Sequence, residues 1–334
     1  MKILRLNSQT FPIIPEEREI LSCLNTEIIE LEGINDDEIA TAAKDCDAIM
    51  VVSSFLRNAV VKQLAKCRII ARMGTGYDKI DVAQATRQGI MVTNLPAFCT
   101  DEVADHTMSL LLSVARQLDY FQKRMRIGKG PCLVPHIHRL STRILGIVGF
   151  GRIGRAVAKR ANAFGMKILV VDPALKPDEA QAPGIQSANM DRALSESDYL
   201  CLLCPLSNET RQMLTMNELR KMKPSAVLIN TSRGELVNEN DLAQALREKT
   251  IRFAAIDVYG TINVFAPDGF PTIHPYFQLD NVVLTPHVAA LSEEAMLEQR
   301  IKSSEEVVRV LSGKWPENLV NRQVKPWFKI KHPG

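Results

Sequence analysis

The sequence contains no apolar run that approaches the roughly 18 residues that suggest a membrane-spanning helix. Aromatic residues make up only 5% of it, and its 41 Lys and Arg residues are nearly balanced by 38 Asp and Glu residues. Because the basic residues are spread along the chain, the composition does not indicate a nucleic-acid partner. The chain passes directly into a strand-like segment at residues 1–7, without the pattern of a targeting signal. We therefore expect a cytoplasmic protein that neither enters a membrane nor binds nucleic acid.

The cysteines argue against a disulfide framework and against a metal site. There are seven, an odd number, and they are scattered along the chain. Cys201 and Cys204 have C-x-x-C spacing, but they lie in a strand-like run without a second pair, so two buried thiols are the favoured interpretation. His136 and His138 are spaced like metal ligands, yet no acidic partner lies near them. We expect residues 128–142 to form a solvated loop, and we expect no metal.

The length of 334 residues, of which 46% are hydrophobic, is enough for about two domains. In the first 100 residues, short apolar segments alternate with amphipathic ones over short connections. Such alternation predicts a parallel sheet covered by helices on both faces, which is an α/β fold. The expected strands are 2–6, 27–31, 48–52, 68–72 and 90–94, and the expected helices lie near 15–24, 35–45, 57–66 and 79–88.

Two loops at the ends of these strands are candidate sites. Ser53 and Ser54 follow one strand, and the segment 73–78, which contains Gly74 and Gly76, follows the next. Ligands of parallel sheets bind outside the carboxyl ends of the strands, and a turn of small residues can hold a carboxylate with its N–H groups. A plain tight turn explains the two glycines equally well.

The segment from Arg143 to Arg160 has the pattern of a strand, a glycine turn and a helix. Gly149, Gly151 and Gly154 have the G-x-G-x-x-G spacing. The first glycine makes the turn, the second lets a pyrophosphate approach the backbone, and the third packs the helix on the strand. Phosphate would then bind the N–H groups at the start of the helix. The segment predicts a dinucleotide site.

The residues after this helix indicate which dinucleotide is bound. Gly165 ends the helix, and a second apolar strand at 166–171 leads to Asp172. A carboxylate about 20 residues after the fingerprint can accept hydrogen bonds from an adenine ribose. It would also repel a 2′-phosphate, and Pro173 offers no cation to offset that repulsion. We therefore expect NAD to be preferred over NADP.

Strand and helix signals resume after Asp172, and three strands end beside residues that can carry chemistry. Arg233 lies just past one strand, while Asp257 and His287 end two others. Any one of them could form an ordinary exposed salt bridge, but three at strand ends favour a site in the crevice of the glycine turn. The expected strands lie near 198–204, 226–231, 252–257 and 282–285, and the expected helices near 208–221 and 239–248.

Two longer helices are expected outside these alternating segments. The first begins near residue 101, capped by Thr100 or Asp101, and is the natural bridge between the domains. Its apolar content exceeds one stripe, which indicates packing on several sides. The second runs from Ser292 to about Leu311. Trp315 and Trp327, which follow it, are expected to anchor a tail at the surface.

Five motifs in a fixed order resemble those of one family. The motifs are Arg72-Met-Gly-Thr-Gly-Tyr-Asp78-Lys-Ile-Asp81, the G-F-G-R-I-G fingerprint, Asn230-Thr-Ser-Arg-Gly234, Asp257-Val-Tyr259 and Thr285-Pro-His287. Together they resemble the D-isomer-specific 2-hydroxyacid dehydrogenases, nearest the phosphoglycerate-dehydrogenase-like and C-terminal-binding-protein-like branches. The resemblance implies a flavodoxin-like substrate domain, residues 1–100 plus 291–334, around a doubly wound Rossmann NAD-binding domain, residues 101–290. It also implies a homodimer paired through the cofactor domains.

The same resemblance implies roles for individual residues. Arg233 matches the family's substrate arginine, whose guanidinium fork can grip an α-keto carboxylate and polarise the keto oxygen. His287 matches its acid/base, which delivers a proton to that oxygen as hydride arrives. The residues expected to bind substrate are Gly74, Thr75, Gly76 and Ser53. The residues expected to bind the cofactor are Thr75, Gly149, Gly151, Arg152, Ile153, Gly154, Asp172, Cys204, Thr231, Ser232, Arg233, Asp257, His287, Ala289 and Ala290.

One residue of the family pattern is missing. Ile262 stands where a glutamate would buttress the histidine, and the surrounding loop, 260–278, is longer than usual. Asn263 lies one residue beyond the expected place. Our hypothesis is that Asn263 orients His287, with Asp268 as the alternative.

These features lead to hypotheses from two classes. The first is an NAD-dependent enzyme that transfers a hydride between NAD(H) and a D-2-hydroxy acid or 2-keto acid. The second is an NAD(H)-sensing binding protein, similar to a corepressor, with vestigial catalysis. Retention of Arg233 and His287 favours the enzyme, and loss of the glutamate favours the sensor. A third, less favoured hypothesis is a formate- or phosphite-like oxidation in which His287 orients an anion. Substrate specificity is expected in the loops 53–58, 74–78 and 260–278.

Overall fold

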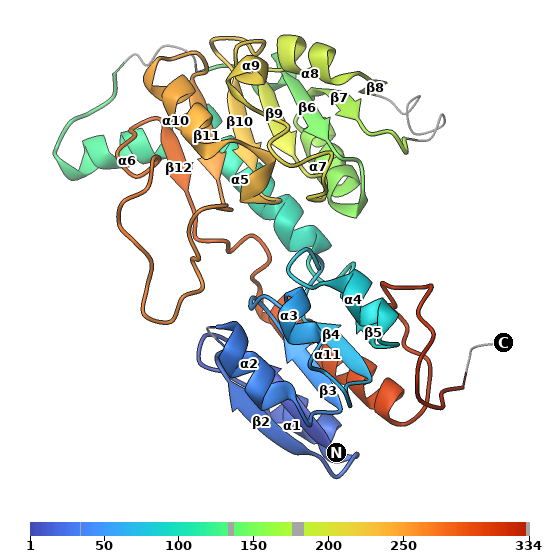
Figure 1. The fold of residues 1–334 in the computed structure, drawn as a ribbon. Coiled ribbons are helices and arrows are strands. Elements are labelled where there is room, and N and C mark those ends of the chain that lie inside the picture. Colours follow the sequence, from blue (N-terminus) through green and yellow to red (C-terminus); the bar gives the residue numbers. More distant parts are fainter. Residues whose placement is uncertain (34, 133–136, 176–183, 332–334) are drawn as a thin grey trace. The chain divides into compact units, whose positions relative to one another are not determined.

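The computed structural model describes residues 1–33, 35–132, 137–175 and 184–331. It contains two parallel β-sheets flanked by helices, which confirms the predicted α/β fold (Figure 1). The chain divides into two compact units. The first unit comprises Met1–Phe98, Phe265–Asp268 and Ser292–Gly334, and the second comprises Cys99–Val264 and Gly269–Leu291.

The first unit is built on a five-stranded parallel sheet with the order β2-β1-β3-β4-β5, the flavodoxin-like order. The pairing aligns Lys2 with Glu27 and Ile3 with Ala48. The expected strands agree with these within two residues at each end, because strands buried on both faces are nearly continuous apolar runs. The strands are β1 (Lys2–Leu6), β2 (Glu27–Leu31), β3 (Ala48–Val51), β4 (Ile69–Arg72) and β5 (Met91–Thr93).

Helices cover both faces of this sheet. Alternate strand residues, such as Leu4 and Ile3, point into two different cores. One core contains side chains of α2 (Asp36–Ala43), α3 (Asn58–Val61) and α4 (Val82–Arg87). The other contains side chains of α1 (Pro15–Ser22) and α11 (Glu293–Leu311). Ser292 caps α11 by accepting a 2.9 Å hydrogen bond from the N–H of Ala295, which explains why the helix begins there.

The second unit is built on a seven-stranded parallel sheet with the order β12-β11-β10-β9-β6-β7-β8. Read from β8, the order is that of a doubly wound dinucleotide-binding sheet with one further strand at its edge. The chain reverses direction across the sheet between β6 and β9, and in such folds ligands bind beside that point. The strands are β6 (Ile144–Val148), β7 (Lys167–Val171), β8 (Ile185–Ser187), β9 (Tyr199–Leu202), β10 (Val227–Asn230), β11 (Phe253–Ile256) and β12 (Val282–Leu284).

Two helical layers cover this second sheet. One core joins the strands to α5 (Thr100–Arg116) and α7 (Arg152–Ala163). The other joins them to α8 (Met190–Glu196), α9 (Met216–Leu219) and α10 (Glu239–Arg247). Among its described residues the unit also contains α6 (Leu118–Arg126) and the short 3₁₀ helices η1 (Leu140–Thr142) and η3 (Gly234–Leu236).

Several expected helix boundaries were wrong. Thr100 is the first residue of α5, Cys99 precedes it, and no side chain caps the helix in the part of the chain that the structure describes. The helix expected at 208–221 is reduced to α9. α6 was not expected: Gln117, in the left-handed conformation with φ 54°, separates it from α5, and none of its fully described residues is buried. A helix without a buried face leaves no apolar period to detect.

The structure agrees with two further expectations, the burial of two thiols and the anchoring of the C-terminal segment by its tryptophans. Cys201 and Cys204 are buried, but they belong to different cores, and burial raises the pKa of Cys204 to about 11. The indole of Trp327 donates a 3.2 Å hydrogen bond to the carbonyl of Cys67, while Trp315 packs against the core of the first unit. His136 lies outside the described residues. Within the described ranges, no group of three or more His, Cys, Asp or Glu side chains is placed to hold a metal ion.

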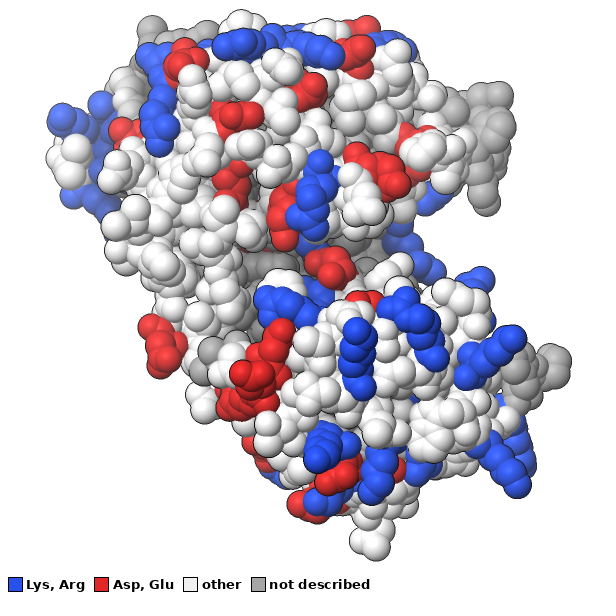
Figure 2. All heavy atoms as spheres, viewed as in Figure 1, with Lys and Arg blue, Asp and Glu red and all other residues white. Residues whose placement is uncertain are grey.

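Helix hydropathy and surface charge bear on the expectation that the protein has no membrane or nucleic-acid partner. Among the described helices, none is both long enough and apolar enough to span a membrane. On the face drawn in Figure 2, Lys and Arg are interspersed with Asp and Glu, so neither sign alone covers that face.

Candidate functional site

The glycine turn joins β6 to α7, and packing requires two of its three glycines. Gly149 has φ 98°, and a Cβ added there would lie 2.5 Å from the backbone nitrogen of Cys204. A Cβ at Gly154 would lie 2.3 Å from the carbonyl oxygen of Gly149. A Cβ at Gly151 would meet no described atom within 4 Å, so this part of the turn is open to an approaching group. These contacts fit the role predicted for each glycine, namely making the turn, admitting the pyrophosphate and packing the helix on the strand.

The first turn of α7 can receive an anion. Gly151 is the N-cap, and no side chain of the described residues caps this helix. Arg152 and Ile153 are its first residues. The early N–H groups of a helix have no partner within the helix and carry its positive dipole end, so a pyrophosphate fits here.

Asp172, at the end of β7, is held beside the glycine turn. One of its oxygens, Oδ2, accepts a 2.5 Å hydrogen bond from the N–H of Phe150, between the first two glycines. The other, Oδ1, accepts from the N–H of Ala174 at 2.7 Å. These bonds fix a negative charge where a dinucleotide fold places the adenine ribose.

Arg233 follows β10 on a turn that is tied to its neighbours. The side chain of Asn230 braces the turn by donating to the carbonyl of Arg233 at 2.8 Å. Ser232 Oγ donates to the carbonyl of Cys204 at 2.6 Å, which links the ends of β9 and β10. Thr231 is buried, and its Oγ1 lies 2.8 Å from that of Thr107 on α5. The turn after β10, which carries Thr231, Ser232 and Arg233, is therefore hydrogen-bonded both to the end of β9 and to α5.

Asp257 ends β11 as a fully buried carboxylate that holds the chain around His287. Its Oδ1 accepts from Thr285 Oγ1 at 2.5 Å and from the N–H of Val288 at 3.0 Å, and its Oδ2 accepts from the N–H of Ala289 at 3.1 Å. Burial alone would raise the pKa of Asp257. Hydrogen bonds to its charged form, first from His106 on α5 and then from Thr285, outweigh that effect and lower the pKa.

His287 itself occupies a restricted backbone conformation. Its φ is 57°, in the left-handed region that residues other than glycine seldom adopt. Its N–H donates to the carbonyl of Thr285 at 3.1 Å. Bonds to Asp257 on both sides of the histidine supply the constraint that such a conformation needs.

His106 on α5 belongs to this cluster and was not anticipated. Its Nε2 lies 3.1 Å from Thr285 Oγ1 and 3.5 Å from Asp257 Oδ1. The Thr285 hydroxyl donates to the carboxylate, so it accepts from the imidazole, and Nε2 therefore carries a hydrogen. The only signal in the sequence is a histidine within an apolar helix, which does not indicate a partner so far along the chain.

A buried Glu–His pair lies near the position of the missing glutamate. Glu239 Oε1 accepts from the N–H of Gly260 at 2.9 Å, and its Oε2 lies 3.4 Å from His274 Nε2. Thr261 Oγ1 lies 3.1 Å from that same imidazole nitrogen. Tyr259, whose ring packs edge-on against His274, donates from its hydroxyl to the carbonyl of Thr285 at 3.1 Å. Hydrogen bonds to Glu239 and His274 thus hold the loop after Asp257, and sequence reasoning did not identify this pair.

The suggested partners of His287 differ from this pair in exposure. Ile262 is half-buried, while Asn263 and Asp268 are exposed. Asp268 belongs to the short segment grouped with the first unit, where Phe265 packs against Phe11 with ring centroids 5.6 Å apart. The contact between Asn263 and His287 stays a prediction.

The turn at Gly74–Gly76 in the first unit is extensively bonded. Gly74 has φ 150°, a backbone conformation that residues with a side chain rarely adopt, which explains the glycine at this position. Thr75 Oγ1 donates to the carbonyl of Leu95 at 2.9 Å, and the Asn94 side chain donates to the carbonyl of Thr75 at 2.7 Å.

The neighbouring Ser53 loop is held by a residue that sequence reasoning missed. Asn7 Oδ1 accepts hydrogen bonds from the N–H groups of Ser53, at 2.8 Å, and Ser54, at 3.3 Å. Asn7 directly follows β1 and has φ 61°, in the left-handed region. The Asn7 side chain therefore restrains the backbone of this loop, which suits a binding site.

The second unit places a glycine turn, an acidic residue, an arginine and a histidine after strands of one doubly wound parallel sheet. The fold and these residues define a dinucleotide-dependent oxidoreductase.

Comparison with known proteins identifies the family. Residues 108–289 match the family model described as "D-isomer specific 2-hydroxyacid dehydrogenase, NAD binding domain". The chain is 38% identical over 301 residues to a glyoxylate reductase of Korarchaeum cryptofilum, covering 89% of this chain and 88% of that protein. It is also 38% identical over 290 residues to one of Thermococcus litoralis, with coverages of 84% and 85%.

A solved structure agrees with the sequence comparison. The glyoxylate reductase from Paecilomyes thermophila superposes with a TM-score of 0.83 at 26% identity, over 96% of this chain and 99% of that one. The chain belongs to the D-isomer-specific 2-hydroxyacid dehydrogenase family. It is an NAD-dependent oxidoreductase acting on a small hydroxy or keto acid, which confirms the first functional hypothesis.

Proposed function

We propose that this protein uses NADH to reduce a small 2-keto acid to the 2-hydroxy acid, the D isomer where the product is chiral, with glyoxylate, whose product glycolate is achiral, as the first substrate to test. The supporting observation is that Arg233 and His287 follow β10 and β12 of the sheet whose strand β6 opens the glycine turn. The relatives named glyoxylate reductases support the choice of substrate.

The second unit would hold the cofactor, which when bound supplies the hydride. Gly149, Gly151 and Gly154, with the first N–H groups of α7 at Arg152 and Ile153, would bind the pyrophosphate. Asp172 would accept hydrogen bonds from the adenine ribose. The other residues proposed to line the cofactor are Thr75, Cys204, Thr231, Ser232, Arg233, Asp257, His287, Ala289 and Ala290. The fully buried carboxylate of Asp257 would keep its structural role even if Asp257 also contacts the nicotinamide side of the cofactor.

The substrate would be bound and protonated by different residues. The guanidinium of Arg233 would grip the keto acid and polarise its keto oxygen. His287 would donate a proton to that oxygen, because an imidazole with an ordinary pKa of about 6.5 can exchange protons near neutral pH. Gly74, Thr75 and Gly76 would hold the carboxylate with backbone N–H groups, beside Ser53.

The orientation of His287 is the least ordinary part of this mechanism. Asn263 is our proposal for the residue that fixes its tautomer, with Asp268 as the alternative. An amide can orient an imidazole but adds no charge to stabilise its protonated form. The alternative function, an NAD(H) sensor with vestigial catalysis, is favoured only by Ile262 at the position of the family's glutamate.

We also propose a homodimer formed through the second unit. Leu118, Tyr120 and Met125 on α6 are 55%, 42% and 71% exposed, and Ile127 just after it is 66% exposed. Large apolar side chains exposed on a helix whose fully described residues are not buried are often covered by a partner, and the family resemblance points to a second copy. Sedimentation at micromolar concentration should give about twice the 37.2 kDa chain mass.

Two further assignments complete the proposal. Residues 1–100 plus 291–334 would form the substrate domain, and residues 101–290 the NAD-binding domain. The protein would work in the cytoplasm, where its seven free cysteines stay reduced.

The test is NADH consumption by the purified protein with glyoxylate, hydroxypyruvate, phenylpyruvate and sugar-derived 2-keto acids. We expect at least one of these acids to support turnover, and Arg233→Ala to abolish most of it. NADH binding without turnover on any of them would overturn the proposed substrate class.

A further inference from the structure

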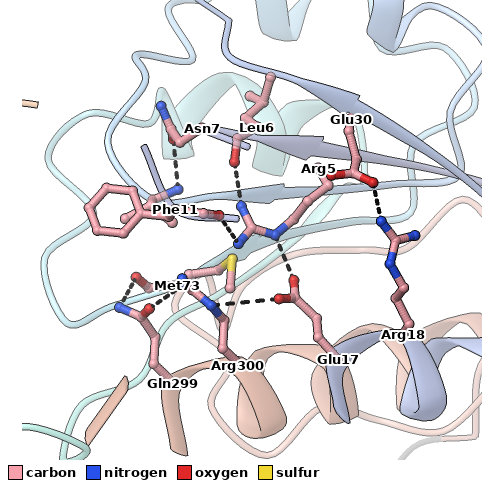
Figure 3. A network of polar contacts seen from close by, with 11 residues as sticks. Arg5, Leu6, Asn7, Phe11, Glu17, Arg18, Glu30, Met73, Gln299 and Arg300 are labelled. Atoms are coloured by element: carbon pink, nitrogen blue, oxygen red, sulfur yellow. Dashed lines mark hydrogen bonds and ion pairs between the residues drawn. The ribbon is translucent and has the colours of Figure 1, made fainter. Parts of the chain in front are cut away.

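A buried polar network joins β1, α1 and α11 in the first unit (Figure 3). The side chains of Arg5 and Glu17 are 0% exposed, and that of Arg300 is 8% exposed. Arg5 Nε lies 2.6 Å from Glu17 Oε1, and Arg300 Nε lies 3.6 Å from Glu17 Oε2. Charges are costly to bury, and apolar side chains of similar size often fill such a space with no loss of stability. The network is therefore a candidate for a role beyond folding.

The network ends at the backbone of the Gly74–Gly76 turn. Arg300 Nη1 donates to Gln299 Oε1 at 2.7 Å, which orients the amide of Gln299. The amide nitrogen, Nε2, then donates to the carbonyl of Met73 at 3.1 Å. Gln299 is only 5% exposed, so no bulk water is at hand to replace this donor. Figure 3 shows the side chains of Arg300 and Gln299 coming from α11 and lying next to Met73.

Three successive carbonyls, those of Met73, Gly74 and Thr75, are each fixed by a donor. Met73 accepts from Gln299 and also from Arg72, Gly74 accepts from the N–H of Leu95 at 2.9 Å, and Thr75 accepts from Asn94 at 2.7 Å. In a trans peptide the carbonyl and the following N–H point in opposite directions. Fixing these oxygens therefore fixes the directions of the N–H groups.

We propose that Gln299 is a positioning residue for substrate binding. It holds the Met73–Gly74 peptide, whose own N–H donates to the carbonyl of Arg72 at 2.9 Å, so that the N–H groups after it, at Thr75 and Gly76, are preset to receive the substrate's carboxylate. This inference rests on the proposed role of Gly74–Gly76 in the reductase. Glu17 and Arg300 contribute by holding the Gln299 amide with its nitrogen toward the turn.

Two substitutions separate the parts of this arrangement. Gln299→Glu keeps an acceptor for Arg300 but has no hydrogen to donate to Met73, whose carbonyl then faces a carboxylate. Gln299→Met keeps the approximate size and removes both bonds. Glu298→Gln, at the neighbouring exposed position of α11, is the matched control.

The expected result is a change in substrate binding alone. In both variants KM for glyoxylate should rise about 10-fold, because small misplacements of binding groups weaken binding strongly, while kcat stays within about threefold. KM for NADH and the melting temperature should stay close to those of Glu298→Gln. An unchanged KM for glyoxylate in both variants overturns the proposal. A joint loss of kcat, NADH binding and thermal stability also overturns it, because Gln299 would then only maintain the fold.

Oxamate, an unreactive carboxylate analogue of a 2-keto acid, separates this inference from the proposed function. If no 2-keto acid supports NADH oxidation, the proposed function fails, and oxamate affinity measured by calorimetry with NADH decides the role of Gln299. About 10-fold weaker oxamate binding by Gln299→Glu than by the wild type supports that role. Equal binding by the two proteins, or no binding by the wild type, overturns it.

Discussion

His106 and Asp257 share the hydroxyl of Thr285. Thr285 Oγ1 lies 3.1 Å from His106 Nε2 and 2.5 Å from Asp257 Oδ1, and the imidazole nitrogen and the carboxylate oxygen are 3.5 Å apart. This cluster connects α5 to the ends of β11 and β12. Because Asp257 also holds Val288, a disturbance at His106 should reach His287.

Replacing His106 should therefore impair catalysis, although His106 is not among the residues proposed to contact the substrate. His106→Leu removes the donor to Thr285, and we expect kcat for glyoxylate reduction to fall about 10–100-fold through misplacement of His287. His106→Gln can still offer an amide N–H and should recover most of the activity. Steady-state kinetics of both variants, with the exposed Ser109→Ala on the same helix as control, test this. A kcat within twofold of wild type in His106→Leu would contradict the linkage.

Asp257 should contribute to stability in a pH-dependent way. Although burial opposes ionisation, hydrogen bonds to its carboxylate lower the pKa below the ordinary value of about 3.9. A carboxyl group whose pKa is lower in the folded state stabilises that state at pH values above its unfolded pKa. The contribution is lost as pH falls through the folded value. In Asp257→Asn, the free energy of unfolding from denaturant titrations should be lower near neutral pH and fall less steeply below about pH 4 than in the wild type. Parallel pH dependences would show that Asp257 carries no such linkage.

The strands and the glycine turn could be predicted from the sequence because their causes are local. Buried parallel strands are short apolar runs, and the G-x-G-x-x-G spacing lies within six consecutive residues, although the atoms that require Gly149 come from Cys204 after another strand. Asn7, His106 and Gln299 could not be predicted. Each acts on a backbone or side chain distant in sequence, such as the contact of Gln299 with Met73, 226 residues away. Such contacts depend on the completed packing of the unit, which leaves no local pattern.

Cofactor preference should depend on Asp172. Its carboxylate is fixed beside the glycine turn by Phe150 and Ala174, so a 2′-phosphate would meet a negative charge that cannot easily move away. We expect kcat/KM with NADH to exceed that with NADPH by at least about 10-fold, and Asp172→Ser to narrow the ratio. Initial rates with both cofactors at saturating glyoxylate measure this. Comparable wild-type efficiencies would remove Asp172 from the proposed cofactor site.

The cysteines should differ sharply in reactivity. Burial raises the pKa of Cys204 to about 11, so at pH 8 only about one thiol in a thousand is the reactive thiolate. Cys201 is also buried with a raised pKa, whereas Cys23 is exposed. Brief treatment with iodoacetamide, followed by peptide mass mapping, should show alkylation of Cys23 and protection of Cys201 and Cys204. Denaturant should abolish the protection. Rapid labelling of Cys204 in the native protein would contradict the buried-thiol interpretation.

The proton-donor role of His287 predicts a large effect of its removal. His287→Ala should lower kcat about 10²–10⁴-fold, the usual range for general acid–base catalysis. Asn263→Ala should cost less, because it removes only an orienting group. Asn263→Glu would add a negative charge that stabilises the imidazolium and raises its pKa. Reduction needs the protonated histidine, so the decline of kcat/KM with rising pH should then occur at higher pH than in the wild type.

The pH profiles of these variants distinguish the possible partners of His287. If Asp268→Asn shifts the decline to lower pH while Asn263→Ala leaves it in place, Asp268 is the partner and the role of His287 survives. Asp191→Asn, at a remote and largely exposed ion pair with Lys221, is the control and should leave the profile unchanged. If His287→Ala reduces glyoxylate nearly as fast as the wild type, the proton comes from water or another group. In that case the left-handed turn at His287 serves the architecture of the strand ends and not the reaction.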